Sequence, residues 1–199
     1  MNEILVEMEQ FARKNNIPVV LPDTREYLVN LIKEKQPKRI LEIGMAIGFS
    51  GANMLGACTD SEIVELEAST PNIELALENY KRLGLLDRVT IIEGDCMKTL
   101  PELVSQGEKF DFIFLDGPKG KYIDMIDLIK PLMSEGCIWV SDNVLFRGMV
   151  QDGQEITSKR FEVTVESLRN FINTLQNDKE LVTEILHIGD GLSLVERIK

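Results

Sequence analysis

The sequence has a single histidine, His187, and only three cysteines, Cys58, Cys96 and Cys137, which lie far apart and form no CxxC pair. This inventory argues against a Cys/His zinc site and against a Ser–His or Cys–His catalytic pair. Dispersed, odd-numbered cysteines fit a reducing compartment, so we expect a cytoplasmic protein.

Long apolar runs and an excess of positive charge are also missing. No run approaches the roughly 20 apolar residues that span a bilayer, so no membrane partner is expected. The first ten residues, MNEILVEMEQ, are acidic and do not resemble a signal peptide. With 22 basic and 33 acidic residues the net charge is −11. This charge excludes a uniformly basic nucleic-acid sleeve, and DNA is not an expected partner, but a local basic patch remains compatible with it.

What remains is an ordinary globular composition, with 44% hydrophobic and 28% charged residues in a chain of 199. That length suits one domain better than two. We therefore predict a single domain over residues 1–199, in which residues 1–36 form an N-terminal helical segment.

Short apolar runs alternate with amphipathic segments along the chain. The runs predict strands at 39–44, 62–67, 88–93, 110–115, 137–141, 181–187 and 191–198. The amphipathic segments predict helices at 2–14, 23–36, 49–58, 70–84, 97–105, 121–133 and 158–177. This alternation predicts an α/β fold with a mainly parallel sheet, helices on both faces and an antiparallel hairpin at the C-terminus.

An acidic residue stands in or after each of the first five predicted strands: Glu42, Glu67, Asp95, Asp116 and Asp142. A single carboxylate after a strand often caps a helix or begins a turn. Five on one rim of a sheet repel one another unless cations or hydroxyl groups offset them. Because ligands of such sheets bind beyond the carboxyl ends of the strands, we expect the functional site there.

The first three strand ends indicate adenosine recognition. The turn with glycines 44, 48 and 51 allows a ligand to approach the backbone closely. Glu67 is spaced to accept hydrogen bonds from ribose hydroxyl groups, and Asp95 is placed to meet an adenine amino group. No GxxxxGK[ST] motif is present, so a phosphate cradle is not expected.

The next two strand ends offer oxygen ligands. Asp116, Asp142 and Asn143 are the kind of ligands that magnesium takes. Lys119 follows Asp116 by three residues. Most turn lysines are simply solvated, but a lysine beside a metal ion can act as a general base, because the nearby positive charge favours its neutral form.

Together these segments resemble the metal-dependent class I O-methyltransferases, the group of the catechol and caffeoyl-CoA O-methyltransferases. The resemblance runs from about residue 17 to the C-terminus. It is carried by LEIGMAIGFSG (41–51), ELE (65–67), EGDC (93–96), FLDGPK (114–119), SDNVLFRG (141–148) and GDGLSL (189–194).

The resemblance implies a Rossmann-like class I methyltransferase fold with a seven-stranded sheet, and S-adenosylmethionine as methyl donor. It places the donor at Val20, Glu42, Gly44, Ser50, Glu67, Asp95, Cys96 and Asp116. It assigns a divalent cation, Mg²⁺ or another such as Mn²⁺ or Ca²⁺, to Asp116, Asp142 and Asn143. Lys119 matches the catalytic lysine.

The acceptor stays open at this stage. KQPKRILEIG and DNVLFRGMV are most similar to bacterial tRNA hydroxyuridine methyltransferases, which implies 5-hydroxyuridine at the wobble position of the tRNA anticodon loop. A small catechol-like phenol is the alternative, and a non-catalytic module that binds the methyl donor is the second. Phe146 and Arg147 are candidates for shaping the acceptor pocket. The N-terminus is about one helix shorter than in many relatives, which bears on the homodimer expected for the family.

Overall fold

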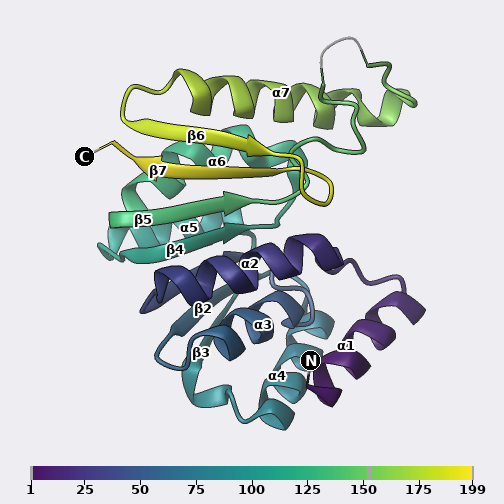
Figure 1. Ribbon diagram of the computed structural model, residues 1–199, viewed down its shortest axis with the longest axis vertical. Coiled ribbons are helices and arrows are strands. Elements are labelled where there is room, and N and C mark those ends of the chain that lie inside the picture. Colours follow the sequence, from purple (N-terminus) through teal and green to yellow (C-terminus); the bar gives the residue numbers. More distant parts are fainter. Residues whose placement is uncertain (1, 152–153, 199) are drawn as a thin grey trace.

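The computed structural model describes residues 2–151 and 154–198, which contain one seven-stranded sheet. Its strands are β1 (Arg39–Ile43), β2 (Glu62–Glu67), β3 (Val89–Glu93), β4 (Phe110–Leu115), β5 (Met133–Ser141), β6 (Leu181–Leu186) and β7 (Leu192–Arg197). Their order is β3-β2-β1-β4-β5-β7-β6 (Figure 1). The first five strands are parallel, and β7 is antiparallel to both β5 and β6. The predicted α/β fold with its C-terminal hairpin is confirmed.

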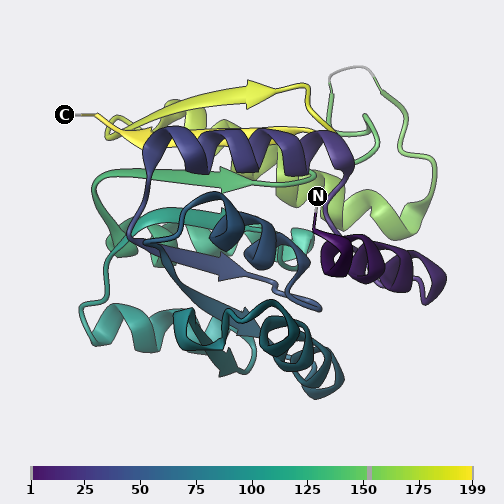
Figure 2. The same ribbon diagram turned by 60° about the horizontal axis from the view of Figure 1, so that its bottom comes forward.

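Helices cover both faces of this sheet. They are α1 (Glu3–Lys14), α2 (Pro22–Lys35), α3 (Phe49–Ala57), α4 (Thr70–Leu83), α5 (Cys96–Ser105), α6 (Tyr122–Ile129) and α7 (Glu162–Asn177). Buried residues of α1 to α4 form the core on one face, and those of α5 to α7 form the core on the other. Figure 2 shows the dark purple α2 across one face and the light green α7 behind the sheet. None of these helices combines the length and apolar character that crossing a membrane requires.

The central strand β4 shows how the sequence produces two cores. Phe112 and Phe114 pack with the α1 to α4 side, whereas Ile113 and Leu115 pack with the α5 to α7 side. Successive side chains of a strand point to opposite faces, and a parallel sheet is buried on both, so an uninterrupted apolar run is what this position needs.

Several predicted boundaries are wrong. The helix expected at 158–177 begins at Glu162, after a short 3₁₀ turn, and the strand expected at 137–141 begins four residues earlier, at Met133. The helix expected at 121–133 ends at Ile129, because Pro131 cannot continue it, and a short 3₁₀ turn leads directly into β5 at Met133. The helix expected to begin at Asp23 begins at Pro22, a residue suited to the first helical turn.

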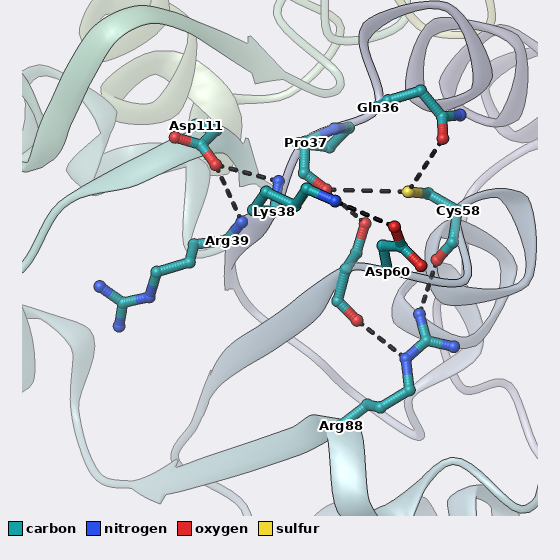
Figure 3. Close-up of polar contacts among 9 residues, drawn as sticks. Gln36, Pro37, Lys38, Arg39, Cys58, Asp60, Arg88 and Asp111 are labelled. Carbon is teal, nitrogen blue, oxygen red and sulfur yellow. Dashed lines mark hydrogen bonds and ion pairs between the residues drawn. The ribbon is translucent and has the colours of Figure 1, made fainter.

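Polar contacts hold the amino ends of the strands together, at the edge opposite the predicted site (Figure 3). The backbone N–H groups of Lys38 and Arg39 both donate to Asp111, at 2.9 and 3.0 Å. The Lys38 ammonium pairs with Asp60 at 3.0 Å, and Arg88 donates to backbone carbonyl oxygens that precede β2. Lys38 and Arg39 of the KQPKRI segment therefore support the fold at the far edge of the sheet.

Candidate active site

A cavity of about 410 Å³ lies beyond the carboxyl ends of β1 to β4, and we call it the first cavity. It is lined by Ile43, Gly44, Leu66, Glu67, Ala68, Gly94, Asp95, Cys96, Asp116, Gly117 and Pro118. Five of the eight residues predicted to meet the methyl donor are among them. Val20, Glu42 and Ser50 are not, and all three are buried.

The turn after β1 is shaped by close backbone approach. Gly44 has φ +97°, and a Cβ there would lie 2.5 Å from the carbonyl oxygen of Asp116. Only glycine fits this position. Glu67 stabilises the turn, because its carboxylate accepts hydrogen bonds from the backbone N–H groups of Ala46 and Ser69, each at 2.8 Å. Glu67 thus both lines the cavity and holds its glycine-rich wall.

The end of β3 contributes Asp95 and Cys96. Asp95 caps α5 by accepting the N–H of Met97 at 3.0 Å, and it also lines the first cavity. Capping and lining are therefore compatible for this residue. Burial, together with the neighbouring Asp95 carboxylate, raises the pKa of the Cys96 thiol, so Cys96 offers the cavity a neutral side chain at pH 7.

Glu42 belongs to a buried polar cluster beneath the turn. It lies opposite Glu65 in the register of β1 and β2, and both carboxyl groups are fully buried. The Ser50 hydroxyl donates to Glu42, and the Tyr80 hydroxyl donates to Glu65. Burial raises the pKa of Glu65 to about 7, and burial together with Glu65 raises the pKa of Glu42 well above its usual value. Near neutrality at least one of the two carboxyl groups therefore carries a proton.

We expect Glu65→Gln to make the protein less sensitive to rising pH. Glu65 binds its proton up to about pH 7 when folded, against about 4.5 when unfolded, so stability falls as the pH rises between these values. The loss is on the order of a few kcal/mol. Glutamine cannot ionise, yet its carbonyl still accepts from Tyr80. In thermal melts from pH 5 to pH 8, the melting temperature of the variant should fall less than that of the wild type, and at pH 8 it should be the higher of the two.

Glu62→Gln is the matched control, because Glu62 lies in the same strand and is exposed. It removes the same charge without relieving a buried group. If the melting temperatures of Glu65→Gln and Glu62→Gln change equally with pH, the charged form of Glu65 does not destabilise the folded protein, and the expectation is wrong.

A second cavity of about 570 Å³ lies beside the first, beyond the ends of β4 and β5. It is lined by Pro18, Val19, Leu21, Asp116, Gly117, Lys119, Asp142, Asn143, Arg147, Gly189 and Asp190. Asp116 and Gly117 line both cavities. The structure therefore brings Asp116, Lys119, Asp142 and Asn143 to one place, next to the first cavity.

The second cavity contains two neighbouring carboxyl groups, one of which is buried. Asp142 is 1% exposed, and burial together with Asp116 raises its pKa to about 7. Its Oδ1 accepts the backbone N–H of Asn143 at 2.7 Å. Lys119 forms an ion pair with Asp116. Over residues 2–151 and 154–198, no three His, Cys, Asp or Glu side chains are grouped to hold a metal ion. The candidate ligand set is thus two carboxylates and one amide, all oxygen donors, which fits a hard divalent cation that retains water.

Sequence reasoning missed part of the second cavity. Asp190, between two glycines in the turn from β6 to β7, lines it, and so do Pro18, Val19 and Leu21 before α2. The Gly-Asp-Gly sequence at 189–191 could have indicated Asp190, since an aspartate in such a turn often accepts hydrogen bonds from the loop or from a ligand. Nothing local reveals that this turn lies beside the end of β5.

The comparison with known proteins agrees with this geometry. A sequence profile described as O-methyltransferase matches residues 1–198, and the chain belongs to this family. The caffeoyl-CoA O-methyltransferase of Eucalyptus gunnii is 28% identical over 206 residues, covering 99% of this chain and 82% of that protein.

Solved structures give the same result. A putative caffeoyl-CoA O-methyltransferase from Staphylococcus aureus has a TM-score of 0.89 at 26% identity, covering 98% of this chain and 92% of that one. An SAH-bound methyltransferase from Podospora anserina has a TM-score of 0.85 at 27% identity, covering 100% and 89%. The predicted family, fold and enzyme class, an S-adenosylmethionine-dependent O-methyltransferase, are confirmed.

Proposed function

We propose that this chain transfers the methyl group of S-adenosylmethionine from the first cavity to a hydroxyl oxygen held in the second, with the help of a divalent cation. The observation that carries the proposal is the wall shared by the two cavities, Asp116 and Gly117. Because both cavities reach Asp116 and Gly117, a sulfonium methyl in the first cavity and an acceptor oxygen in the second could meet beside these residues, and such positioning contributes much of the rate of in-line transfer.

In the first cavity, Gly44, Glu67, Asp95, Cys96 and Asp116 would contact the methyl donor. Glu67 and Asp95 supply acceptors for ribose and adenine, and the bare backbone at Gly44 admits the methionine end. Val20, Glu42 and Ser50 were also predicted to contact the methyl donor. They are buried and would act indirectly, by supporting the turn after β1.

In the second cavity, Asp116, Asp142 and Asn143 would hold the cation, which when bound lowers the pKa of a coordinated hydroxyl group. Lys119, which pairs with Asp116 as an ammonium, would relay the proton that the acceptor hydroxyl loses: the ammonium gives a proton to solvent, and the neutral amine then takes the proton of the hydroxyl group. The methyl carbon leaves sulfur as its bond to oxygen forms, which yields S-adenosylhomocysteine and a methyl ether.

The acceptor that we propose is 5-hydroxyuridine at the wobble position of tRNA. Support comes from DNVLFRGMV, one of two stretches similar to the tRNA enzymes, because Asn143 and Arg147 of this stretch line the second cavity. The other stretch, KQPKRILEIG, begins at the far edge of the sheet, where Lys38 and Arg39 are engaged with Asp60 and Asp111. That stretch supports the fold and the first cavity but no tRNA contact.

A catechol-like phenol is the second candidate, favoured by the caffeoyl-CoA O-methyltransferases among the relatives. Both acceptors present two neighbouring oxygens to a cation. A nucleoside mass profile of tRNA from a deletion strain separates them, when it is run beside a catechol assay with the purified enzyme. Loss of methoxyuridine in the strain supports the first acceptor. An unchanged profile together with catechol turnover supports the second.

We expect EDTA to abolish methyl transfer to either acceptor and added Mg²⁺ to restore it. The reason is that Asp116, Asp142 and Asn143 place two carboxylates and one amide in the second cavity, where an ionised acceptor would be repelled unless a cation offset the negative charge. Calorimetry with S-adenosylhomocysteine in EDTA is the control and should show binding. Full turnover in EDTA would disprove the metal role, and tight binding without transfer to any acceptor would favour the non-catalytic module.

A further inference from the structure

Arg147 is held at the mouth of the second cavity by an unusual backbone. Arg147 and the preceding Phe146 have φ values of +58° and +42°, a backbone region that residues other than glycine rarely adopt. The Arg147 N–H donates to the carboxylate of Asp190 at 2.5 Å, and the Leu145 N–H donates to the Asp190 carbonyl oxygen at 3.1 Å. The turn from β6 to β7 therefore fixes this loop in a strained conformation, which places the Arg147 side chain at the cavity.

The guanidinium of Arg147 is supported but not neutralised. It lies 5.5 Å from the ring centroid of Phe161, which packs edge-on against Phe146 at 5.5 Å. Stacking of this kind orients a guanidinium and leaves its N–H groups available. Within residues 2–151 and 154–198, Arg147 forms no ion pair.

The other walls of the second cavity differ from this one. Pro18, Val19 and Leu21 form an apolar side suited to the face of a ring. Asp116, which also lines the first cavity, and Asp142 mark the side where the reacting hydroxyl belongs if the proposed function holds. An acceptor in this cavity would therefore meet an apolar surface, the carboxylates of Asp116 and Asp142, and the exposed guanidinium of Arg147, whose own backbone N–H engages the Asp190 carboxylate.

We infer that the acceptor carries an anionic group, a phosphate or a carboxylate, and that Arg147 binds it while the ring hydroxyl faces Asp116 and Asp142. This inference rests on the proposed function, since it takes the second cavity as the acceptor site. A guanidinium is the side chain best matched to such groups, because its paired N–H donors meet two oxygens at once. The phosphate of a nucleotide and the carboxylate of a phenolic acid are the two sources of this chemistry.

Two acceptor pairs that differ mainly in the anionic group test the inference. One pair is 5-hydroxyuridine and its 5′-monophosphate, and the other is catechol and 3,4-dihydroxybenzoate. For each compound, kcat/KM is measured with Mg²⁺ and S-adenosylmethionine, and Kd is measured calorimetrically with Mg²⁺ and S-adenosylhomocysteine. The wild type should favour the charged member of at least one pair by about tenfold or more in Kd. The pair that shows the preference identifies the source of the anion.

Arg147→Gln should reduce that preference to about twofold or less, and Arg147→Lys should retain part of it, since a lysine keeps the charge but loses the paired donors. Arg160→Gln is the matched control, because Arg160 also stacks on Phe161, at 4.5 Å, but does not line the cavity. It should keep the wild-type preference.

The inference is wrong if the wild type shows no preference in either pair, or if the preference survives Arg147→Gln. It is also wrong if Arg160→Gln removes the preference equally, because the effect would then belong to Phe161. Failure of the proposed function looks different. In that case the charged compound still binds through Arg147, but no methyl group is transferred.

Discussion

Asp142→Asn should reduce kcat/KM for methyl transfer by roughly 100-fold or more, while Kd for S-adenosylhomocysteine stays within about twofold of wild type. Asp142 lines the second cavity and not the first, so the methyl-donor site keeps its walls. The amide retains an oxygen that accepts the Asn143 N–H, now 2.7 Å from Asp142 Oδ1, so the local backbone should persist. Steady-state kinetics and calorimetry on the same preparation separate the two effects.

Folding provides a second readout for the same variant. Because burial and Asp116 raise the pKa of Asp142 to about 7, its charge destabilises the folded state at higher pH, and the neutral amide should melt at least as high as wild type at pH 8. Asp124→Asn, in an exposed position on α6, controls for loss of one carboxylate. An active Asp142→Asn enzyme would mean that Asp142 is no cation ligand. Lost donor binding would mean that it shapes the first cavity.

The strand ends were the part of the site most accessible from sequence. Glu67, Asp95, Asp116 and Asp142 each follow a short apolar run, and the carboxyl ends of parallel strands meet at one edge whatever the details of packing. The strand order itself came from the structure, but the carboxyl ends of parallel strands meet at one edge in any order, so the coarse position of these four residues needed no coordinates.

Contacts set by register and by distant segments were not accessible in this way. Glu42 was expected to meet the methyl donor, but its side chain turns into the core, where it faces Glu65 across β1 and β2. That pairing depends on which residues of two strands stand opposite each other, and a slip of one residue would reverse it. Asp190 reaches the second cavity through a turn about 50 residues after Asn143, and nothing in the local sequence shows that these two segments meet.

Lys119 has two proposed roles, since its nitrogen carries charge and also accepts a proton, and the two roles can be tested separately. Lys119→Arg should keep the ion pair with Asp116 but cannot accept a proton near neutrality, so kcat should fall by roughly 100-fold to 10,000-fold. Lys119→Gln should fall by a similar factor. The first cavity excludes Lys119, so both variants should bind S-adenosylhomocysteine normally.

The pH profile distinguishes a proton acceptor from a structural cation. If Lys119 removes the proton, the residual activity of Lys119→Gln should rise about tenfold per pH unit, because hydroxide then takes over, while the activity of the wild type should rise less steeply because it keeps its own proton acceptor. Lys121→Arg, exposed in the same 3₁₀ turn, should follow the wild-type profile. A fully active Lys119→Arg would reduce the role of Lys119 to electrostatic support of Asp116, and would leave proton removal to solvent at the shared wall.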